Sequence, residues 1–277
     1  MLKDCLDALR RENPLIHCIT NYVTANDCAN LLLACGASPI MADDPREAGE
    51  ITAACRGLDL NMGTLSASRV EAMLAAGEKA NELDHPVVLD PVGVGASSFR
   101  RETAKQLLRR IRFTAIRGNL SEILVLARGQ GRCRGVDAGE GIRRENLQQV
   151  AQFAMDFSEK TGAVILITGE TDIAACENRA YCLSNGNPMM ARVTGTGCQL
   201  SALTAAFLAA NPQRPLEAAA AAAATMGVCG ELAARRLSHA DGTMSYRSYM
   251  IDAASNLEGK TLEELADYRM INRGGEQ

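Results

Sequence analysis

The stretch from Ala191 to Ala210 reads ARVTGTGCQLSALTAAFLAA and joins a glycine turn to a long apolar helix. Gly195 and Gly197 let the backbone adopt conformations that other residues avoid. A helix that begins directly after them presents unpaired N–H groups and the positive end of its dipole. We therefore expect a short strand, a turn and an anion-binding site, most often for phosphate. The residue at the mouth of that site is Cys198.

Short apolar segments rich in β-branched residues alternate with segments of helical period along the chain. Fully apolar strands between helices predict a mostly parallel sheet that is covered on both faces. The segment 163–193 differs, because short polar turns separate its strands and predict antiparallel hairpins at one edge. The expected strands cover residues 37–42, 58–63, 86–91, 113–118, 163–169, 172–176, 179–184 and 189–193.

Helices are expected between these strands and over nearly all of the chain after Cys198. They lie near residues 2–9, 21–35, 68–80, 101–111, 119–128 and 144–160. Three helix starts carry a capping residue followed three positions later by glutamate. These pairs are Ser68 with Glu71, Asn119 with Glu122, and Thr261 with Glu264. Because the links are short and no repeat or hinge divides the sequence, we predict one domain over residues 1–277, a three-layer α/β/α sandwich.

Composition and charge narrow the class of protein. The sequence is 47% hydrophobic and 22% charged, as in a soluble globular protein, and its net charge of −4 gives no basic face for nucleic acid. The alanine run at 218–224 has polar flanks and indicates a buried helix rather than a membrane span. The first residues lack the unbroken apolar region that a secretory signal needs, and the ten cysteines include no C-x-x-C pair for a metal. We expect a cytoplasmic protein.

The ends of the expected strands hold the candidate site residues, because ligands bind beyond the carboxyl ends of such strands. Asn21 precedes a helix, where it serves as an N-cap or turns its amide toward a ligand. Met41 follows a strand, and its thioether belongs to the core or packs on an aromatic ring. Gly63 marks a simple turn or a close approach of backbone to ligand. His17 is interpreted as a core histidine.

Polar residues follow three further strands. Asp90 either caps a loop or anchors metal-bound water, and Arg117 can pair with phosphate oxygens. Glu122 either completes a capping box or holds a hydrated Mg²⁺. Thr168 forms a turn or contacts a phosphate or ribose. Because all of these positions share one sheet edge with the glycine turn at 194–198, a nucleotide–phosphate site explains them jointly.

Longer motifs at these strand ends resemble those of the ribokinase-like kinases, and within them the hydroxyethylthiazole kinase family. They are RGNLSEI (117–123), DPVGVGAS (90–97), VTGTGC (193–198), ITGETD (167–172) and PLIHCITNYVTANDCANLLLACGASPIMADDPRE (14–47). The resemblance implies a ribokinase-like fold. It also implies a thiamin-biosynthesis or salvage kinase that phosphorylates the hydroxyl of 4-methyl-5-(2-hydroxyethyl)thiazole with MgATP.

The resemblance also implies roles for individual residues. The thiazole contacts would be Asn21, Met41, Gly63 and Gly195, the ATP contacts Arg117, Thr168 and Gly197, and the Mg²⁺ residues Glu122 and Asp90. The partners implied are the thiazole and ATP, with no nucleic acid and no membrane. A homotrimer with active sites between subunits is implied as well.

Most ribokinase-like enzymes carry an aspartate base where this chain has Cys198. A thiol at a helix N-terminus has its pKa lowered toward neutrality. We therefore hypothesise that Cys198 is a weak base and chiefly a positioning group. On that hypothesis Cys198→Ala loses ~10²-fold in rate and Cys198→Asp stays active.

Other functions are compatible with the same fold. One alternative is a hydroxymethylpyrimidine or sugar kinase, and another is the ADP-dependent NAD(P)H-hydrate dehydratase. Both relatives normally carry aspartate in place of Cys198, and the dehydratase lacks the CITN stretch at 18–21. A non-catalytic ligand-binding module is a further alternative. The glycine-rich, charged stretch at 128–141 predicts a long loop.

Overall fold

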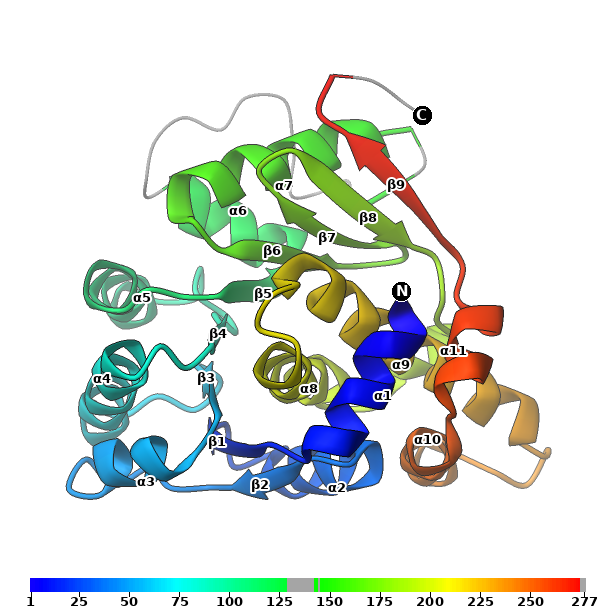
Figure 1. Ribbon diagram of the computed structural model, residues 1–277, viewed down its shortest axis with the longest axis horizontal. Coiled ribbons are helices and arrows are strands. Elements are labelled where there is room, and N and C mark those ends of the chain that lie inside the picture. The colour runs from blue at the N-terminus through cyan, green and yellow to red at the C-terminus, as the bar shows by residue number, and fades with distance from the viewer. Residues whose placement is uncertain (129–141, 144, 275–277) are drawn as a thin grey trace.

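The computed structural model describes residues 1–128, 142–143 and 145–274, which contain one nine-stranded sheet with helices on both faces (Figure 1). Its strand order is β2-β1-β3-β4-β5-β6-β7-β8-β9. The strands are β1 (Leu15–Ile19), β2 (Ser38–Ile40), β3 (Gly57–Asn61), β4 (Val87–Asp90), β5 (Ala115–Asn119), β6 (Val164–Thr168), β7 (Asp172–Cys176), β8 (Arg179–Leu183) and β9 (Tyr268–Asn272). The strands from β2 to β6 are parallel, and β7, β8 and β9 add antiparallel pairs. The predicted three-layer sandwich is confirmed.

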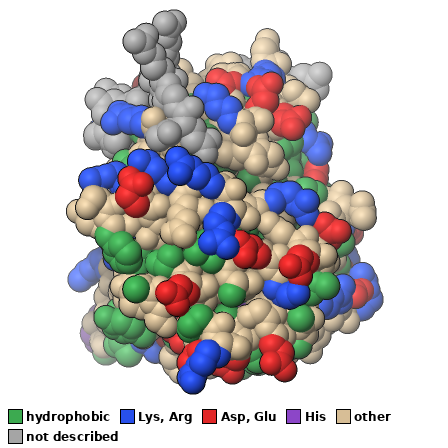
Figure 2. Space-filling model, turned by 90° about the vertical axis from the view of Figure 1, so that its left-hand side faces the viewer, with side chains coloured by type: hydrophobic (Ala, Val, Ile, Leu, Met, Phe, Trp, Pro, Cys, Tyr) green, Lys and Arg blue, Asp and Glu red, His purple; other side chains and the backbone are tan. Residues whose placement is uncertain are grey.

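Two sets of helices bury the two faces of the sheet in separate hydrophobic clusters. One face carries α3 (Ala48–Ala54), α4 (Ala67–Glu82), α5 (Ser98–Arg110), α6 (Leu120–Arg128) and α7 (Leu147–Thr161). The other carries α1 (Leu2–Glu12), α2 (Ala25–Cys35), α8 (Thr196–Ala210), α9 (Pro215–Arg236), α10 (Thr243–Asn256) and α11 (Gly259–Leu265). Basic and acidic side chains are interspersed over the face formed by α3, α4 and α5 (Figure 2).

Helices α8 and α9 are buried on almost all sides. Helix α8 packs against β1, β3 and β4, which explains why it is apolar all round rather than on one stripe. Helix α9 is long and apolar enough to cross a membrane, yet 83% of its most apolar window is buried inside the protein. Its alanines at 218–224 are at most 2% exposed, so the predicted buried helix is confirmed.

The structure differs from the predicted elements in several places. Seven of the eight expected strands are present as β2 to β8, but in the expected strand 189–193 the first four residues belong to a 3₁₀ helix, η1 (Pro188–Arg192), and Val193 follows it. Pro188 favours the start of a helical turn. The side-chain oxygen of Asn187 accepts a hydrogen bond from the N–H of Met189 at 3.0 Å and caps that turn. Strands β1 and β9 were not predicted. Of the loop expected at 128–141, Arg128 ends α6 and residues 129–141 lie outside the described residues.

Two of the three predicted helix caps are wrong. Helix α4 begins after Ser66, whose side chain accepts the Arg69 N–H at 3.2 Å, so Ser68 lies inside the helix. Helix α11 begins at Gly259, two residues before Thr261. The N-cap residues are Ser66 and Glu258, both in an extended conformation. Each helix therefore begins before the predicted capping residue. His17 is a core histidine as predicted, with its two ring nitrogens 2.8 Å from Thr52 Oγ1 and 2.7 Å from the Ala42 carbonyl.

Asp59 in β3 is an unpaired carboxyl in the core. It is fully buried, and neither oxygen has a hydrogen-bond partner within the described part of the chain. Burial, followed by the nearby Asp90, raises the pKa of Asp59 well above its ordinary value. The folded protein therefore keeps Asp59 protonated to a higher pH than the unfolded chain, which ionises it near pH ~4. This difference lowers the free energy of unfolding as the pH rises above ~4.

We expect Asp59→Val to raise the free energy of unfolding at pH 7 by about 1–3 kcal/mol, because it removes a buried polar group without a partner. The gain should shrink as the pH falls toward ~4, where the unfolded wild type also becomes protonated. Urea titrations at several pH values would measure both effects. Asp59→Asn serves as the matched control, because it keeps the shape but cannot ionise. A pH slope in Asp59→Asn equal to that of the wild type would contradict the assignment.

Candidate active site

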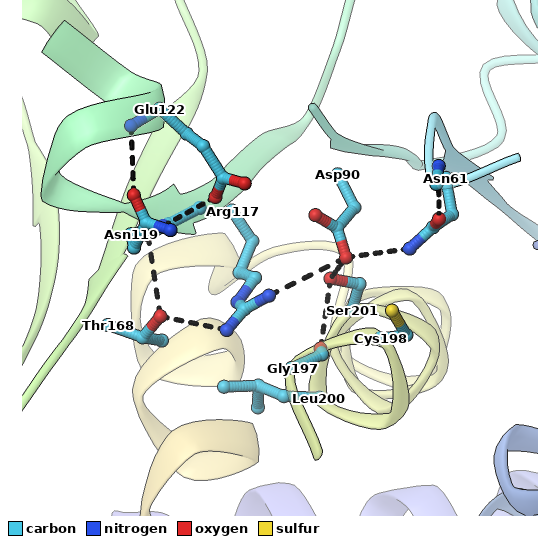
Figure 3. Close-up of polar contacts among 12 residues, drawn as sticks. Asn61, Asp90, Arg117, Asn119, Glu122, Thr168, Gly197, Cys198, Leu200 and Ser201 are labelled. Carbon is cyan, nitrogen blue, oxygen red and sulfur yellow. Dashed lines mark hydrogen bonds and ion pairs between the residues drawn. The ribbon is translucent and has the colours of Figure 1, made fainter. Parts of the chain in front are cut away.

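Asp90, the last residue of β4, lies at the centre of a polar cluster at the carboxyl ends of the strands (Figure 3). Its Oδ2 accepts hydrogen bonds from Asn61 Nδ2 and Ser201 Oγ, both at 2.8 Å, and lies 3.5 Å from Arg117 Nη1. Burial raises the pKa of Asp90 to about 6 against the opposing effect of Arg117. Its Oδ1 is buried and has no partner among the described residues, so one oxygen remains for a ligand.

Arg117 projects from β5 toward the first turn of α8. Its Nη2 donates to Thr168 Oγ1 at 2.8 Å, which joins β5 to the end of β6. A Cβ atom on Gly197 would lie 2.5 Å from Arg117 Nη1, so only glycine allows the guanidinium to come this close to the helix. A guanidinium beside a helix N-terminus combines two positive features and suits a phosphate.

Glu122 acts as a helix cap, as predicted. Its Oε2 accepts the Asn119 N–H and Asn119 Oδ1 accepts the Glu122 N–H, both at 2.9 Å. Its Oε1 accepts the N–H of Gly93 at 2.8 Å, which fixes the loop after β4. Figure 3 shows the carboxylates of Glu122 and Asp90 on the same side of the Arg117 guanidinium. The cap therefore also places a second carboxylate beside the anion site.

Cys198 lies on the other side of Asp90, where Asn21 and Gly63 join the cluster. Asn21 Nδ2 donates to Cys198 Sγ at 3.0 Å and to Asn61 Oδ1 at 3.2 Å. The Gly63 N–H donates to the same Asn61 oxygen at 2.8 Å. The amide N–H groups of Asn21 therefore contact Cys198 and Asn61, while its Oδ1 accepts the N–H of Thr24, the residue before α2.

The expectation of a lowered pKa for Cys198 is wrong. Burial, and then the neighbouring Asp90, raise the pKa of the Cys198 thiol above its ordinary value. Removal of the thiol from water and the nearby negative charge of Asp90 both disfavour the thiolate, against smaller opposing effects of Asn61, Thr24 and Arg117. Cys198 is therefore protonated at neutral pH in this structure.

Gly195 and Met41 are the two remaining predicted thiazole contacts, and they lie in different parts of the site. Gly195 has a left-handed φ of 87°, and a Cβ there would lie 2.2 Å from Thr24 Cγ2. Thr24 in turn donates its N–H to Asn21 Oδ1 at 3.1 Å, so Gly195 lies against the turn that carries Asn21. Met41 follows β2 at the outer end of the edge and is 38% exposed.

A cavity of about 710 Å³ extends from the anion site over the β6–β7 turn to α9. Arg117, Thr168 and Gly197 line one end of it, and Asn185, Met226 and Gly227 line the other. Asp172 also lines it, accepts the Gly169 N–H at 3.0 Å, and has its pKa raised by burial to about 6. The volume is within the range of small-molecule sites and has room for a nucleotide.

Three residues of the cluster were missed in the sequence. Asn61 had a signal, because it is a polar residue at a strand end two positions before Gly63. Ser201 lies three residues after Cys198 on α8 and so belongs to the same helix face. Arg100 gave no signal; it donates to the carbonyls of Val92 and Gly63, both at 2.8 Å, and ties two site loops together.

The cluster suits a hydrated magnesium ion rather than a fully protein-bound metal. Within residues 1–128, 142–143 and 145–274, no group of three or more His, Cys, Asp and Glu side chains is placed to hold a metal. Mg²⁺ keeps several waters and commonly uses one or two carboxylates together with substrate phosphates. The free Oδ1 of Asp90 and the carboxylate of Glu122, beside a phosphate site, fit that requirement.

Comparisons with known proteins identify the family. The model of the Hydroxyethylthiazole kinase family matches residues 6–260. The hydroxyethylthiazole kinase of Clostridium acetobutylicum is 59% identical over 270 residues, which cover 97% of this chain and 99% of that protein. The hydroxyethylthiazole kinase of Desulfovibrio desulfuricans is 45% identical, with 97% and 98% of the two chains covered. The solved structure of a hydroxyethylthiazole kinase protein from Pyrococcus horikoshii OT3 superposes with a TM-score of 0.86 at 32% identity and covers 98% of each chain. The chain belongs to the hydroxyethylthiazole kinase family, a family of kinases.

Gly197→Ala should separate stability from activity. Alanine is a better helix former than glycine by about 1 kcal/mol, which offsets part of the cost of moving Arg117 away from the buried Asp90, so we expect stability to change less than activity. Its Cβ, however, displaces the Arg117 guanidinium, and we expect KM for ATP to rise by about tenfold or more, as when a charged hydrogen bond is lost. Steady-state kinetics and thermal melting would measure the two effects.

The control for this prediction is a double-mutant cycle. In an Arg117→Ala background, Gly197→Ala has no guanidinium to displace and should change KM little further. Additive losses in the double variant would show that the glycine acts independently of Arg117.

Proposed function

We propose that the protein, acting as one catalytic domain, transfers the terminal phosphoryl group of ATP to the hydroxyl of 4-methyl-5-(2-hydroxyethyl)thiazole. The observation that carries this proposal is the placement of Arg117 beside Gly197 in the first turn of α8, between a nucleotide-sized cavity and the hydrogen-bonded pair of Asn21 and Cys198. A phosphate held there lies between donor and acceptor. Family membership supports the same reaction.

The nucleotide side of the reaction uses Arg117, Thr168 and Gly197. The backbone N–H groups of the first turn of α8 and the Arg117 guanidinium would contact the phosphates, which leaves the base in the cavity over α9. Asp90 and Glu122 would hold a hydrated Mg²⁺. When bound, Mg²⁺ neutralises negative charge on the phosphate oxygens. These roles are the ones that the sequence suggested.

The acceptor side uses Asn21, Met41, Gly63 and Gly195 around the thiazole, with Cys198 beside the hydroxyl. Phosphoryl transfer through a loose transition state depends mainly on positioning and on charge stabilisation. Because the pKa of Cys198 is raised, its resting thiol keeps its proton and orients the acceptor hydroxyl. Asn21 fixes the sulfur through its amide N–H.

We extend the proposal to a homotrimer with acceptor sites between subunits. Two apolar side chains next to Asn21 support a covering partner, because Tyr22 is 75% exposed and Val23 is 59% exposed. A cytoplasmic location remains part of the proposal, and the buried position of α9 is in keeping with it. The alternatives of a hydroxymethylpyrimidine kinase and an NAD(P)H-hydrate dehydratase are less well supported, since the family match points to the thiazole kinases.

The reaction is tested by measuring ADP release with MgATP and, separately, hydroxyethylthiazole and hydroxymethylpyrimidine as acceptors. We expect release with the thiazole and a product whose mass is that of the thiazole monophosphate. Release with the pyrimidine alone would overturn the acceptor assignment. Folded protein that releases no ADP with either acceptor would overturn the kinase assignment.

Cys198 is tested through the pH dependence of kcat. We expect Cys198→Ala to lower kcat by ~10²-fold or less and to leave the shape of the pH profile between 6 and 9 unchanged. The reason is that a thiol with a raised pKa does not titrate in this range. Loss of an ionisation from the profile of Cys198→Ala would instead identify the thiolate as a base.

A further inference from the structure

The segment 184–192 forms a wall of the nucleotide cavity and rests on two glycines of α9. A Cβ on Gly227 would lie 2.6 Å from the carbonyl oxygen of Asn185. A Cβ on Gly230 would lie 2.5 Å from Met190 Sδ. Both Asn185 and Met190 line the cavity. The two glycines therefore let the wall approach the helix more closely than any larger residue would.

Glu231, the next residue of α9, anchors this wall by two hydrogen bonds. Its Oε1 accepts Asn185 Nδ2 and the Gly186 N–H, each at 3.0 Å. Glu231 does not itself line the cavity, whereas Asn185 and Gly186 both do. Its carboxylate reaches the nucleotide site only through these two residues.

Asn185 also forms hydrogen bonds with the C-terminal part of the chain. Its Nδ2 also donates to the Leu265 carbonyl at 2.9 Å, and its Oδ1 accepts the Asp267 N–H at 2.7 Å. The side chain thus joins the cavity wall to α9, to the end of α11 and to the residue before β9. With both amide hydrogens and the oxygen engaged, Asn185 has one orientation that satisfies all of its partners.

We infer that Glu231 is a positioning residue for nucleotide binding, acting through Asn185 and Gly186 on the wall of the cavity; this inference rests on the proposed kinase function. Without the carboxylate, the Gly186 N–H and one Asn185 N–H lose their acceptor, and the wall has to be ordered again when a nucleotide binds. The acceptor residues Asn21 and Gly63 belong to other elements. The effect is therefore confined to the nucleotide side.

The experiment compares Glu231→Ala, Glu231→Gln and Arg235→Ala with the wild type in the full chain. Calorimetric titration with MgADP gives nucleotide affinity, and steady-state kinetics gives KM for ATP and for the thiazole separately. We expect Glu231→Ala to weaken MgADP binding and raise KM for ATP by about tenfold, with KM for the thiazole within about twofold. Glu231→Gln keeps an oxygen for both hydrogen bonds and should restore affinity to within about twofold.

Arg235→Ala is the matched control. Arg235 lies one turn further along α9, 3.8 Å from the other carboxylate oxygen of Glu231, and touches neither Asn185 nor Gly186 in any hydrogen bond within the described residues. Its removal should leave MgADP binding unchanged. If Glu231→Ala does not fold, Glu231→Asp replaces it, because the shorter side chain keeps the charge but withdraws the oxygen that Asn185 and Gly186 share. The same split between the two KM values is expected.

Three outcomes would overturn the inference. If Glu231→Ala binds MgADP as tightly as the wild type, this inference is overturned while the proposed function stands. Equal rises in both KM values, without rescue by Glu231→Gln, would assign Glu231 a general structural role instead. A wild-type protein that binds no MgADP would overturn the proposed function and this inference together.

Discussion

The buried carboxyl of Asp90 is the contact on which the rest of the site depends. Three side chains from three different elements converge on its Oδ2: Asn61 from β3 and Ser201 from α8 donate hydrogen bonds, and Arg117 from β5 forms an ion pair. An ionised carboxylate removed from water is tolerated only when such partners surround it. The packing of α8 against the centre of the sheet is therefore also what completes the site. The Asp90 carboxyl therefore both joins α8 to the sheet and forms the centre of the site.

Asp90 also lies between two halves of the site that differ in charge. On the side of Arg117, a fixed cation and a helix N-terminus attract negative charge. On the side of Cys198, the amide of Asn21 and the thiol are both neutral and add no further charge to the site. A transferring phosphoryl group needs the first environment, and a neutral hydroxyl acceptor needs the second. The carboxyl at the boundary is shared by both.

Local signals in the sequence were sufficient where the interaction itself is local. Asn119 and Glu122 cap each other across three residues, and that pair was predicted correctly. The hydrogen bond from Ser201 to Asp90 spans 111 residues and had no local signal. The raised pKa of Cys198 also depends on burial and on Asp90, which the helix-dipole argument did not include. The segment 189–193 was assigned as a strand because a short apolar run does not distinguish a strand from a 3₁₀ turn.

The tie between Asn185 and the backbone before β9 has a consequence for the order in which the protein forms during synthesis. The parallel strands from β1 to β6 end at Thr168, so most of the sheet can pair while the chain is still being translated. The wall of the nucleotide cavity, however, is secured by Leu265 and Asp267, and β8 gains its outer neighbour only with β9. A nascent chain on the ribosome can therefore form the polar cluster around Asp90 before the wall of the proposed nucleotide cavity is secured, so that competence for the proposed binding arrives last.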